Sequence, residues 1–462
     1  MKKIILVLLI TLPTITVAQI MDSLSYTEYL GYVKQFHPIA KQADLRLETG
    51  QANLMKARGG FDPKIDVDFN EKDYKNTEYY ERLNATFEVP TWYGIELKAN
   101  FEENNGLFLN PENNVPQDGL FSAGVGFSLG QGLLINKRMA ALKKANFFRE
   151  QTKAERDLLI NDVLFNASIA YFDWLQAYNE TKIYERFLQN AKIRFNGVRS
   201  SVLAGDKAGI DSLEAGIIVK TRSLELEQAK VKLIKARLEA SNFVWLDKTP
   251  VDISDTVKPI LVLEDEIDIA LSLNEAINFS IDSHPKLLAL GSKIDGLDVD
   301  RQLNANKLLP VVDAQYNFLT ETPELANTFN ASAYKATVKV AFPLFLRKER
   351  GDLKLSKLKI QDAEFEFADT QLQIKNKVDA INREINSYKL QNILIENIVE
   401  DYDTLLKAEE RKFSFGESSV FLINNRENKL IESQVKALQL QNKFFTTKAK
   451  LFNSLGIVPN YN

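Results

Sequence analysis

The sequence has few of the residues on which protein chemistry often depends. It contains no cysteine, which excludes disulfides, thiolate metal sites and cysteine nucleophiles. It contains only two histidines, too few for a histidine-rich metal site. The formal charge of −4 is nearly balanced, whereas nucleic-acid-binding proteins are typically basic, so no nucleic-acid partner is expected. We therefore expect a protein that is not an enzyme and has no cofactor.

Long apolar runs are also absent, and the run at the N-terminus is short. Two lysines precede an apolar run over residues 4–12, and Thr16 and Ala18 then supply the small residues of a cleavage site. This order is typical of a secretory signal peptide over residues 1–18. An N-terminal anchor helix is less favoured, because spanning a bilayer takes about 20 residues. No later segment is apolar enough to span, so we expect an exported chain with no transmembrane helix.

A sequence repeat relates the two halves of the chain at an offset of 247 residues. Both histidines, His37 and His284, lie at one position of the repeat, and each is followed by proline. A His–His metal site is one interpretation. Helix capping is favoured, because proline disfavours helix for the residue before it and suits the first turn of the next helix. The other identities are Leu24, Ser25, Glu28, Pro38, Pro63, Asp66 and Asn70, which recur as Leu271, Ser272, Glu275, Pro285, Pro310, Asp313 and Asn317.

The repeat predicts an internally duplicated chain rather than three separate domains. Each copy is expected to contain a helical segment, then strands, then a long helical hairpin. The expected parts are a first repeat over 19–246 with strands 64–130 and hairpin 136–246, a linker over 247–270, and a second repeat over 271–462 with strands 311–343 and hairpin 349–455.

The expected strands alternate apolar and polar residues with a period of two. This pattern fits a soluble sheet with one face on a core, or a transmembrane barrel with lipid outside and water inside. We favour the barrel because the strands have about the length that crosses a membrane when tilted, and because aromatic residues such as Tyr79 and Trp92 gather at their ends. The six segments are 65–70, 83–89, 95–101, 121–129, 312–318 and 334–342.

Six strands are too few to close a barrel within one chain, because the smallest barrels have about eight. The barrel therefore implies an oligomer. Whether all six strands join it, or only two from each half, is open at this stage. The strand number of each half is even, four and two, so the chain returns each time to the side that it left. The helices of both halves are then expected on one side of the membrane.

Two helical segments are too long for a globular core. Between residues 136 and 199 there is no proline, and a stripe of mainly apolar residues recurs in alternate steps of four and three. A similar stripe runs over 367–413. This period of 3.5 predicts coiled-coil packing, and some 64 helical residues reach roughly 95 Å. Turns at Gly205 and Gly416 each lead into a return helix, so the chain should present two antiparallel helical hairpins.

Duplicated strands, long helices and tip turns together resemble the TolC-like outer-membrane efflux protein family. Leu-Ser-x-x-Glu and His-Pro stand near the start of each half, and the tip motifs occupy 205–215 and 416–425. The resemblance covers essentially the whole mature chain. It implies an α+β membrane protein that forms a homotrimer. The trimer would complete an outer-membrane β-barrel, in contact with the lipid, and a long periplasmic α-helical coiled-coil barrel.

The resemblance also implies a function, namely the outer-membrane channel of a tripartite efflux or secretion system in a Gram-negative bacterium. Substrate would pass from an inner-membrane pump through the periplasm to the exterior. The tips would dock on a periplasmic adaptor (membrane fusion) protein. The alternative is a periplasmic coiled-coil adaptor or scaffold, which predicts one hairpin with soluble flanking domains. The docking residues implied are Gly205, Asp206, Ile210, Gly416, Glu417, Ser418 and Phe421.

The tip of this chain departs from the family pattern. The best-known member closes its tip with aspartate rings at the sixth and ninth residues after the second tip glycine, where this chain has Leu422 and Asn425. Phe413 also lacks a hydroxyl that could bridge to Asp211. We therefore expect a gate formed by Leu422 and Asn425, with Asp211 and Glu214 as nearby charges, rather than one held by salt bridges.

Overall fold

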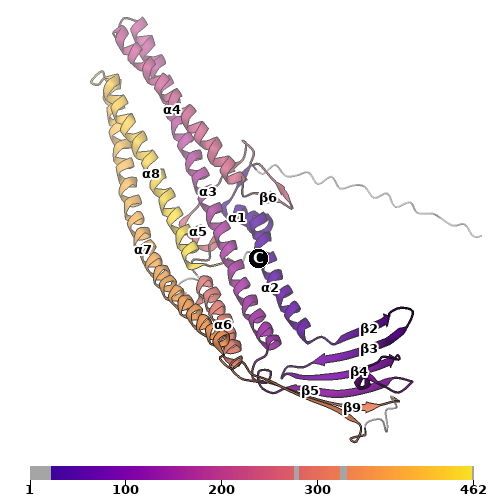
Figure 1. The fold of residues 1–462 in the computed structure, drawn as a ribbon. Helices are drawn as coiled ribbons and strands as arrows, with labels where there is room; N and C mark the ends of the chain where they lie inside the picture. Colours follow the sequence, from indigo (N-terminus) through magenta and orange to yellow (C-terminus); the bar gives the residue numbers. More distant parts are fainter. Residues whose placement is uncertain (1–21, 275–279, 323–329, 460–462) are drawn as a thin grey trace, which may run out of the picture.

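The computed structural model describes residues 22–274, 280–322 and 330–459. The chain is elongated, with a β-sheet at one end and long helices that run away from it (Figure 1). None of the helices in these described ranges is both long enough and apolar enough to cross a membrane. The predicted signal peptide, 1–18, lies outside the described residues.

Both long helices predicted from the 3.5-residue period are present. They are α3 (Lys137–Leu203) and α7 (Arg347–Ser414), followed by the return helices α4 (Gly209–Ser241) and α8 (Val420–Leu455). Every stripe position expected in α3 and α7 is buried or half-buried, as in helices that pack along one seam. The shorter helices are α1 (Tyr26–Phe36), α2 (Pro38–Arg58), α5 (Glu264–Ala270) and α6 (Pro285–Asn306), with 3₁₀ turns at Gly59–Phe61, Pro111–Asn113 and Ile281–Ser283.

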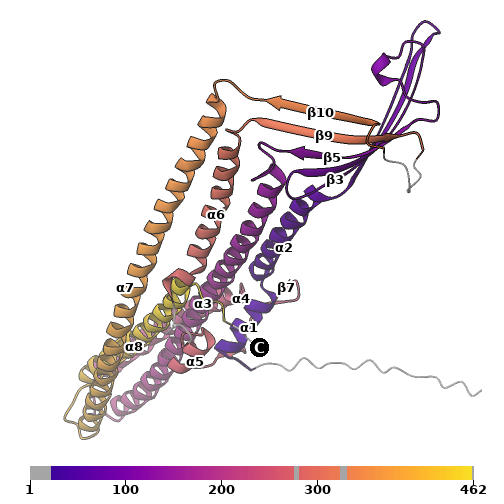
Figure 2. The same cartoon turned by 90° about the horizontal axis from the view of Figure 1, so that it is seen from below.

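The helices pack in the same way in both halves. α3 packs on α2 toward the sheet and on α4 toward the far end, and α7 packs in the same manner on α6 and α8. Near the sheet, α2, α3, α6 and α7 lie side by side in that order (Figure 2). Each half therefore continues as a pair of helices over its whole length, although only one helix of each pair is continuous.

Both histidines cap helices, as expected. His37 ends α1 and begins α2, where its Nδ1 accepts a hydrogen bond from the backbone N–H of Ile39 at 3.2 Å. His284 begins α6 in the same way, accepting from the N–H of Lys286 at 3.0 Å. An Nδ1 that accepts carries no proton, so each cap needs a neutral imidazole. Burial lowers the pKa of both side chains, that of His284 to about 4.

The Leu-Ser-x-x-Glu motif has a clear role in the first half. Ser25 and Glu28 form a reciprocal capping box at the start of α1. In the second half, Ser272 lies in a turn after α5 with a positive φ of 51°. Glu275 lies outside the described residues.

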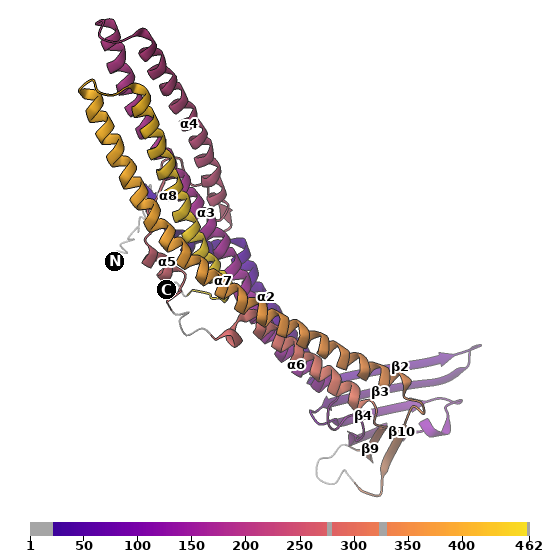
Figure 3. The ribbon, with the colours of Figure 1, turned by 90° about the vertical axis from the view of Figure 1, so that its left-hand side faces the viewer.

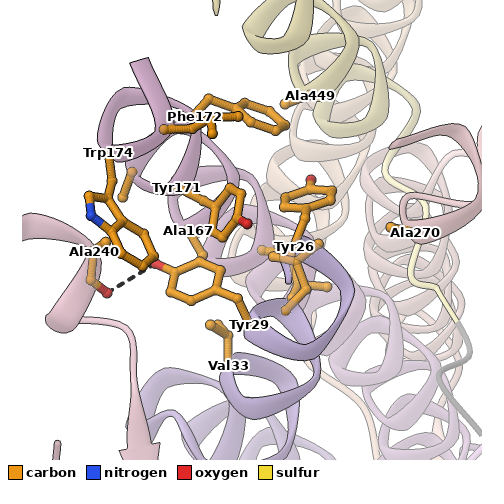
Figure 4. Close-up of a cluster of buried hydrophobic side chains, with 14 of the residues drawn as sticks. Tyr26, Tyr29, Val33, Ala167, Tyr171, Phe172, Trp174, Ala240, Ala270 and Ala449 are labelled. Carbon is orange, nitrogen blue, oxygen red and sulfur yellow. Dashed lines mark hydrogen bonds between the residues drawn. The ribbon is translucent and has the colours of Figure 1, made fainter. Parts of the chain in front are cut away.

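The main hydrophobic core lies midway along the molecule and is rich in aromatic residues. Tyr29, Tyr171 and Trp174 are almost completely buried, and Figure 4 shows them converging from α1 and α3. Buried hydroxyls need partners, and the Tyr29 hydroxyl donates to the carbonyl of Ala240 at 3.0 Å. Phe452 of α8 completes the cluster from the second half.

The segment expected as a linker, 247–270, belongs to this core. It forms a short hairpin with Trp245–Leu246 (β6) and Thr249–Pro250 (β7), then β8 (Lys258–Pro259), which pairs in parallel with β1 (Ser23–Leu24). Its apolar side chains Ile253, Val262 and Ile267 are buried in the main cluster. The connection between the halves is therefore structured, and it fixes one half against the other.

All six predicted strands join one sheet within the chain. The order is β10-β9-β5-β4-β3-β2, and every neighbouring pair is antiparallel. The first half supplies four strands and the second half two. The strands are β2 (Lys64–Asp73), β3 (Glu78–Pro90), β4 (Ile95–Asn105), β5 (Leu120–Ser128), β9 (Val311–Thr320) and β10 (Tyr334–Ala341).

The two faces of the sheet differ, as the alternation predicts. The register places Val67, Ala85, Phe101 and Phe121 in one row across neighbouring strands, so one face is apolar. Large side chains on this face are exposed, including Val67 at 61%. In the part of the chain that the structure describes, no helix packs on this face. In a soluble protein the apolar face of such a sheet packs on a core, and here the apolar face has no such cover within the described residues.

Candidate functional site: the two helical tips

The turns of both hairpins lie at the same end of the molecule, opposite the sheet (Figure 3). The turn between α3 and α4 contains Gly205, and the turn between α7 and α8 contains Gly416. Among the residues that the structure describes, no other part projects as far in this direction. The tips are therefore the part of the helical region best placed to meet a partner.

Both turns are built in the same way, because both helices end in a Schellman motif. In the first turn, Gly205 has a φ of +85° and its N–H donates to the carbonyl of Val202, while the N–H of Asp206 donates to that of Ser201. Gly416, with a φ of +79°, and Glu417 repeat both bonds. A positive φ strains side chains other than glycine, which explains why both tips carry glycine at this position.

The residues expected to dock a partner are mostly exposed. Ile210 is 73% exposed and Phe421 63%, values that are high for large apolar side chains at helix starts. Ser418 differs, because its hydroxyl donates to Glu409 at 2.6 Å and is half-buried. The other expected docking residues, all exposed, are Gly205, Asp206, Gly416 and Glu417.

The four expected gate residues lie near the tips on two different helices. Leu422 and Asn425 are exposed on the first turns of α8, and Asp211 and Glu214 are half-buried on the first turns of α4. No hydrogen bond or ion pair joins the α4 pair to the α8 pair within the described ranges. Within the described part of one chain, the four residues are therefore not joined by hydrogen bonds or ion pairs.

The tips contact each other through apolar and aromatic side chains. Phe413 packs with Val198, Ala215 and Val420, which come from α3, α4 and α8. The Lys207 ammonium lies 4.0 Å from the centre of the Phe413 ring, a cation–π contact between the two turns. Phe413 therefore joins the hairpins although it has no hydroxyl to donate.

A buried charge cluster below the tips was not expected from the sequence. Glu427 of α8 is completely buried, and its carboxylate lies 2.6 Å from Arg194 of α3 and 3.5 Å from Arg222 of α4. Arg194 also lies 3.6 Å from Glu410 of α7, so all four helices contribute. Asn424 accepts a further hydrogen bond from Arg194. Ionic groups this deep are costly unless paired, so the cluster ties the two hairpins together.

The sequence contained a signal for this cluster. The buried face of α4 has alanine at a spacing of seven, at Ala215, Ala229 and Ala236, and Arg222 occupies the missing position of that series. Glu427 likewise follows Ile423 and precedes Leu430 on the buried face of α8. A charge that interrupts an apolar heptad stripe is the pattern that predicts a buried ion pair.

Comparison with known proteins places this geometry in a known fold. A scan of protein-family models and a search of curated proteins found no match. Solved structures do match along 93% of the chain at TM-scores of 0.64 to 0.65. The outer membrane channel CmeC of Campylobacter jejuni is 12% identical and matched over 85% of its length. The open state of the outer membrane channel MtrE of Neisseria gonorrhoeae is 13% identical and matched over 88%. The outer membrane protein VceC of Vibrio cholerae is 13% identical and matched over 96%.

The chain has the fold of outer-membrane channels. The resemblance to the TolC-like family that the sequence suggested is confirmed at the level of the fold. In this TolC-like fold the sheet and the helical tips lie at opposite ends of the molecule.

Proposed function

We propose that the protein is the outer-membrane channel of a tripartite efflux or secretion system and conducts substrate from the periplasm to the exterior. The observation that carries this proposal is the sheet, whose apolar face is exposed and which continues into two long helical hairpins. An apolar face that no core covers is suited to lipid. The polar face would line a water-filled passage. Such a duct needs no cofactor and performs no chemistry.

The proposed location is the outer membrane of a Gram-negative bacterium, with the helices in the periplasm. The sheet end carries aromatic residues where a membrane interface would lie, including Tyr74 and Tyr93, which are 55% and 62% exposed. Tyr79 packs on Phe108 at the end distant from the helices. Export follows from the signal peptide expected over 1–18.

We propose a homotrimer, because one copy leaves apolar surface uncovered on the helices as well. A stripe on α4 repeats every seven residues and contains Ile217, Leu224 and Val231, which are 53%, 60% and 53% exposed. α7 carries exposed Phe365 and Leu372, also seven residues apart. Apolar stripes at a heptad spacing are typical of helices that pack on further helices. Neighbouring copies would supply those helices and complete the helical tunnel.

The two helical tips are the proposed contact with a periplasmic adaptor, itself coupled to an inner-membrane pump. Exposed Ile210 and Phe421 give each tip an apolar anchor, and aromatic anchors are typical of residues that dominate protein interfaces. The surrounding Asp206 and Glu417 would form a polar rim.

At the tip we propose a gate made of Leu422 and Asn425 from each copy, with Asp211 and Glu214 as nearby charges. The exposure of the α8 pair supports this, because side chains that are free within one chain are available to meet across a symmetry axis. The double variant Leu422→Ser, Asn425→Ser should raise single-channel conductance in a planar bilayer. Unchanged conductance would remove these residues from the gate.

The proposed organisation keeps the boundaries expected from the sequence. Residues 19–246 and 271–462 are two copies of one ancestral unit, joined by 247–270. The matching element order, the two histidine caps and the two Schellman turns support a duplication. The second half would then have lost, or the first half gained, one β-hairpin.

Membrane fractionation of the full chain tests the function. We expect the protein in the outer-membrane fraction, migrating on a denaturing gel as a trimer until it is boiled. A variant lacking residues 1–18 serves as the matched control and should stay inside the cell. A monomer in the soluble periplasmic fraction would end the channel proposal.

A further inference from the structure

Among the described residues, the six-stranded sheet has two edge strands without a further neighbour, β2 and β10, and every residue of both strands is exposed. An unpaired edge presents free backbone N–H and carbonyl groups and readily pairs with another chain. The six strands alternate in direction, so β2 and β10 run in opposite directions. The β10 edge of one copy can therefore pair with the β2 edge of the next in the same antiparallel manner as within the sheet.

The two edges also carry opposite charges that can meet. The polar face of β2 carries Asp66 and Asp68 between Lys64 and Lys72, whereas the polar face of β10 carries Lys335 and Lys339. Their apolar faces match as well. Residues facing lipid would be Ile65, Val67 and Phe69 on one edge and Ala336, Val338 and Val340 on the other.

We propose that β10 of one copy pairs with β2 of the next, with Lys339 directly opposite Asp66, so that three copies close a barrel of about eighteen strands. This proposal rests on the trimer proposed above. It adds the pairing partner, the register and the strand number, none of which the trimer alone determines.

The register follows from the pairing within one copy. A row of paired residues begins at Lys64, the first residue of β2, passes through Glu88, Lys98, Gly124 and Asn317, and ends at Lys335. The row thus starts at the helix end of β2 but reaches β10 six residues before its last residue, Ala341.

In a symmetric ring every copy of β2 starts at the same level. We set the helix end of β10, Ala341, level with the helix end of the neighbouring β2, Lys64, so Lys335, six residues before Ala341, faces Asn70. Antiparallel pairing from that point sets Thr337 opposite Asp68 and Lys339 opposite Asp66.

Neighbouring registers are disfavoured by like charges. A shift of two residues must be considered, because a shift of one would turn apolar residues into the lumen. One such shift sets Lys339 opposite Lys64, and the other sets Lys335 opposite Lys72. Like charges directly opposite destabilise a strand pair. Among these three registers, only the proposed one avoids a facing pair of lysines.

The resulting barrel has ordinary geometry. An offset of about six residues per copy over six strands gives a strand tilt of roughly 35°, at the edge of the range seen in membrane barrels. A barrel of this strand number leaves an aqueous channel. The barrel would therefore not be the narrowest point, and selection of substrate would fall to the helical tips.

Disulfide crosslinking tests the register, because the chain has no cysteine of its own. Lys339→Cys is combined in turn with Lys64→Cys, Asp66→Cys and Asp68→Cys in the full-length protein in membranes. We expect the Asp66→Cys pair to yield at least about tenfold more covalent trimer than the other two, since only directly opposed residues have the Cα separation of a disulfide. The four single variants are controls and should give no covalent trimer.

The outcomes separate this proposal from the proposed function. The strongest crosslink with Asp68→Cys or Lys64→Cys would overturn the register. A membrane-bound, heat-resistant trimer with no crosslink from any pair would overturn the edge pairing and leave the channel intact. A soluble monomer would overturn both.

Charge exchange gives a second readout that needs no cysteine. Asp66→Lys should lower the temperature at which the trimer dissociates on a gel, and adding Lys339→Asp should restore it. Asp68→Lys with Lys339→Asp is the mismatched control and should restore less. A double Asp66/Lys339 exchange no more stable than the single variant would overturn the facing pair.

Discussion

The two return helices, α4 and α8, follow similar long helices and similar glycine turns, yet they expose their apolar residues to very different degrees. On α8, Ile431, Phe445 and Phe452 are 4% exposed or less. On α4, Leu224 and Val231 are 60% and 53% exposed. The reason lies in the packing, because α8 contacts α7 and α3, whereas α4 contacts mainly α3. The apolar face of α8 is covered within the chain, whereas that of α4 is left exposed.

The same contrast separates the central core from the sheet. The core buries its aromatic side chains within one copy, while every residue of the edge strands β2 and β10 is exposed. Burial of apolar area is the main favourable term in folding, so the core should decide whether a single copy folds. The α4 stripe and the sheet edges should decide whether copies assemble.

The largest effect should come from the buried return helix. Phe452→Ala removes a side chain that is 0% exposed and leaves a cavity, so the free energy of unfolding should fall by about 4 kcal/mol. Urea titration of the purified protein in detergent, followed by circular dichroism, measures this. Leu405→Ala, at an exposed position of α7, is the matched control with a loss of less than about 0.5 kcal/mol. Equal losses would mean that burial within one copy does not set stability.

The buried charge cluster should produce the next largest effect. Glu427→Gln leaves Arg194 and Arg222 without their carboxylate, and breaking a buried pair in this way should cost about 3 kcal/mol. Glu432→Gln removes a carboxylate from an exposed pair with Lys429 and should cost less than about 1 kcal/mol. If thermal unfolding gave the same midpoint for both variants, the cluster would not hold the hairpins together.

Acid should weaken the protein through His284. Burial lowers its pKa to about 4, whereas an unfolded histidine titrates near 6.5, so only the unfolded state takes up the proton between these values. This contribution is fully present above about pH 6.5 and is lost as the pH falls, by ~3 kcal/mol at pH 4. His284→Asn keeps a capping side chain and removes the titration. Its stability should fall less steeply between pH 6.5 and 4, and an unchanged slope would contradict the assignment.

Changes in the exposed apolar stripe of α4 should have the smallest effect on folding. They should have a large effect on assembly of the trimer. Leu224→Asn with Val231→Asn alters side chains that one copy already exposes, so circular dichroism should be unchanged. The trimer should dissociate at a lower temperature on a gel, because the stripe would no longer be apolar. Substituting Lys220 and Glu227, which are charged residues of α4, by asparagine is the matched control. An intact heat-resistant trimer in the stripe variant would show that α4 is not an interface.

The elements themselves could largely be predicted from the sequence. A period of two located all six strands, and a period of 3.5 located α3 and α7, because side-chain periodicity is a local consequence of backbone geometry. The proline after His37 and after His284 likewise predicted both caps. At the tips, Gly205 and Gly416 predicted the turns, since a positive φ favours glycine.

The candidate site was less predictable. Arg222 and Glu427 each interrupt an apolar stripe in the sequence, but that pattern does not tell which charges meet, and only the packing of the two hairpins brings them together. The segment 247–270 has the composition of a linker, yet it is part of the core because β8 pairs with β1. Such long-range contacts depend on which elements meet, and the period of a segment does not contain that information.

The sequence by itself determined the type of the six sheet strands and of the long helices, the polarity of each face, and the caps and turns at His37, His284, Gly205 and Gly416. Those properties depend on neighbouring residues and on backbone geometry alone. Only the tertiary structure decided that all six strands form one sheet, that β2 and β10 are its free edges, and that the apolar stripe of α8 is covered while that of α4 is not. The physical reason is that a surface is buried only when another surface packs on it, and which surfaces pack together is determined by the folded arrangement of the whole chain.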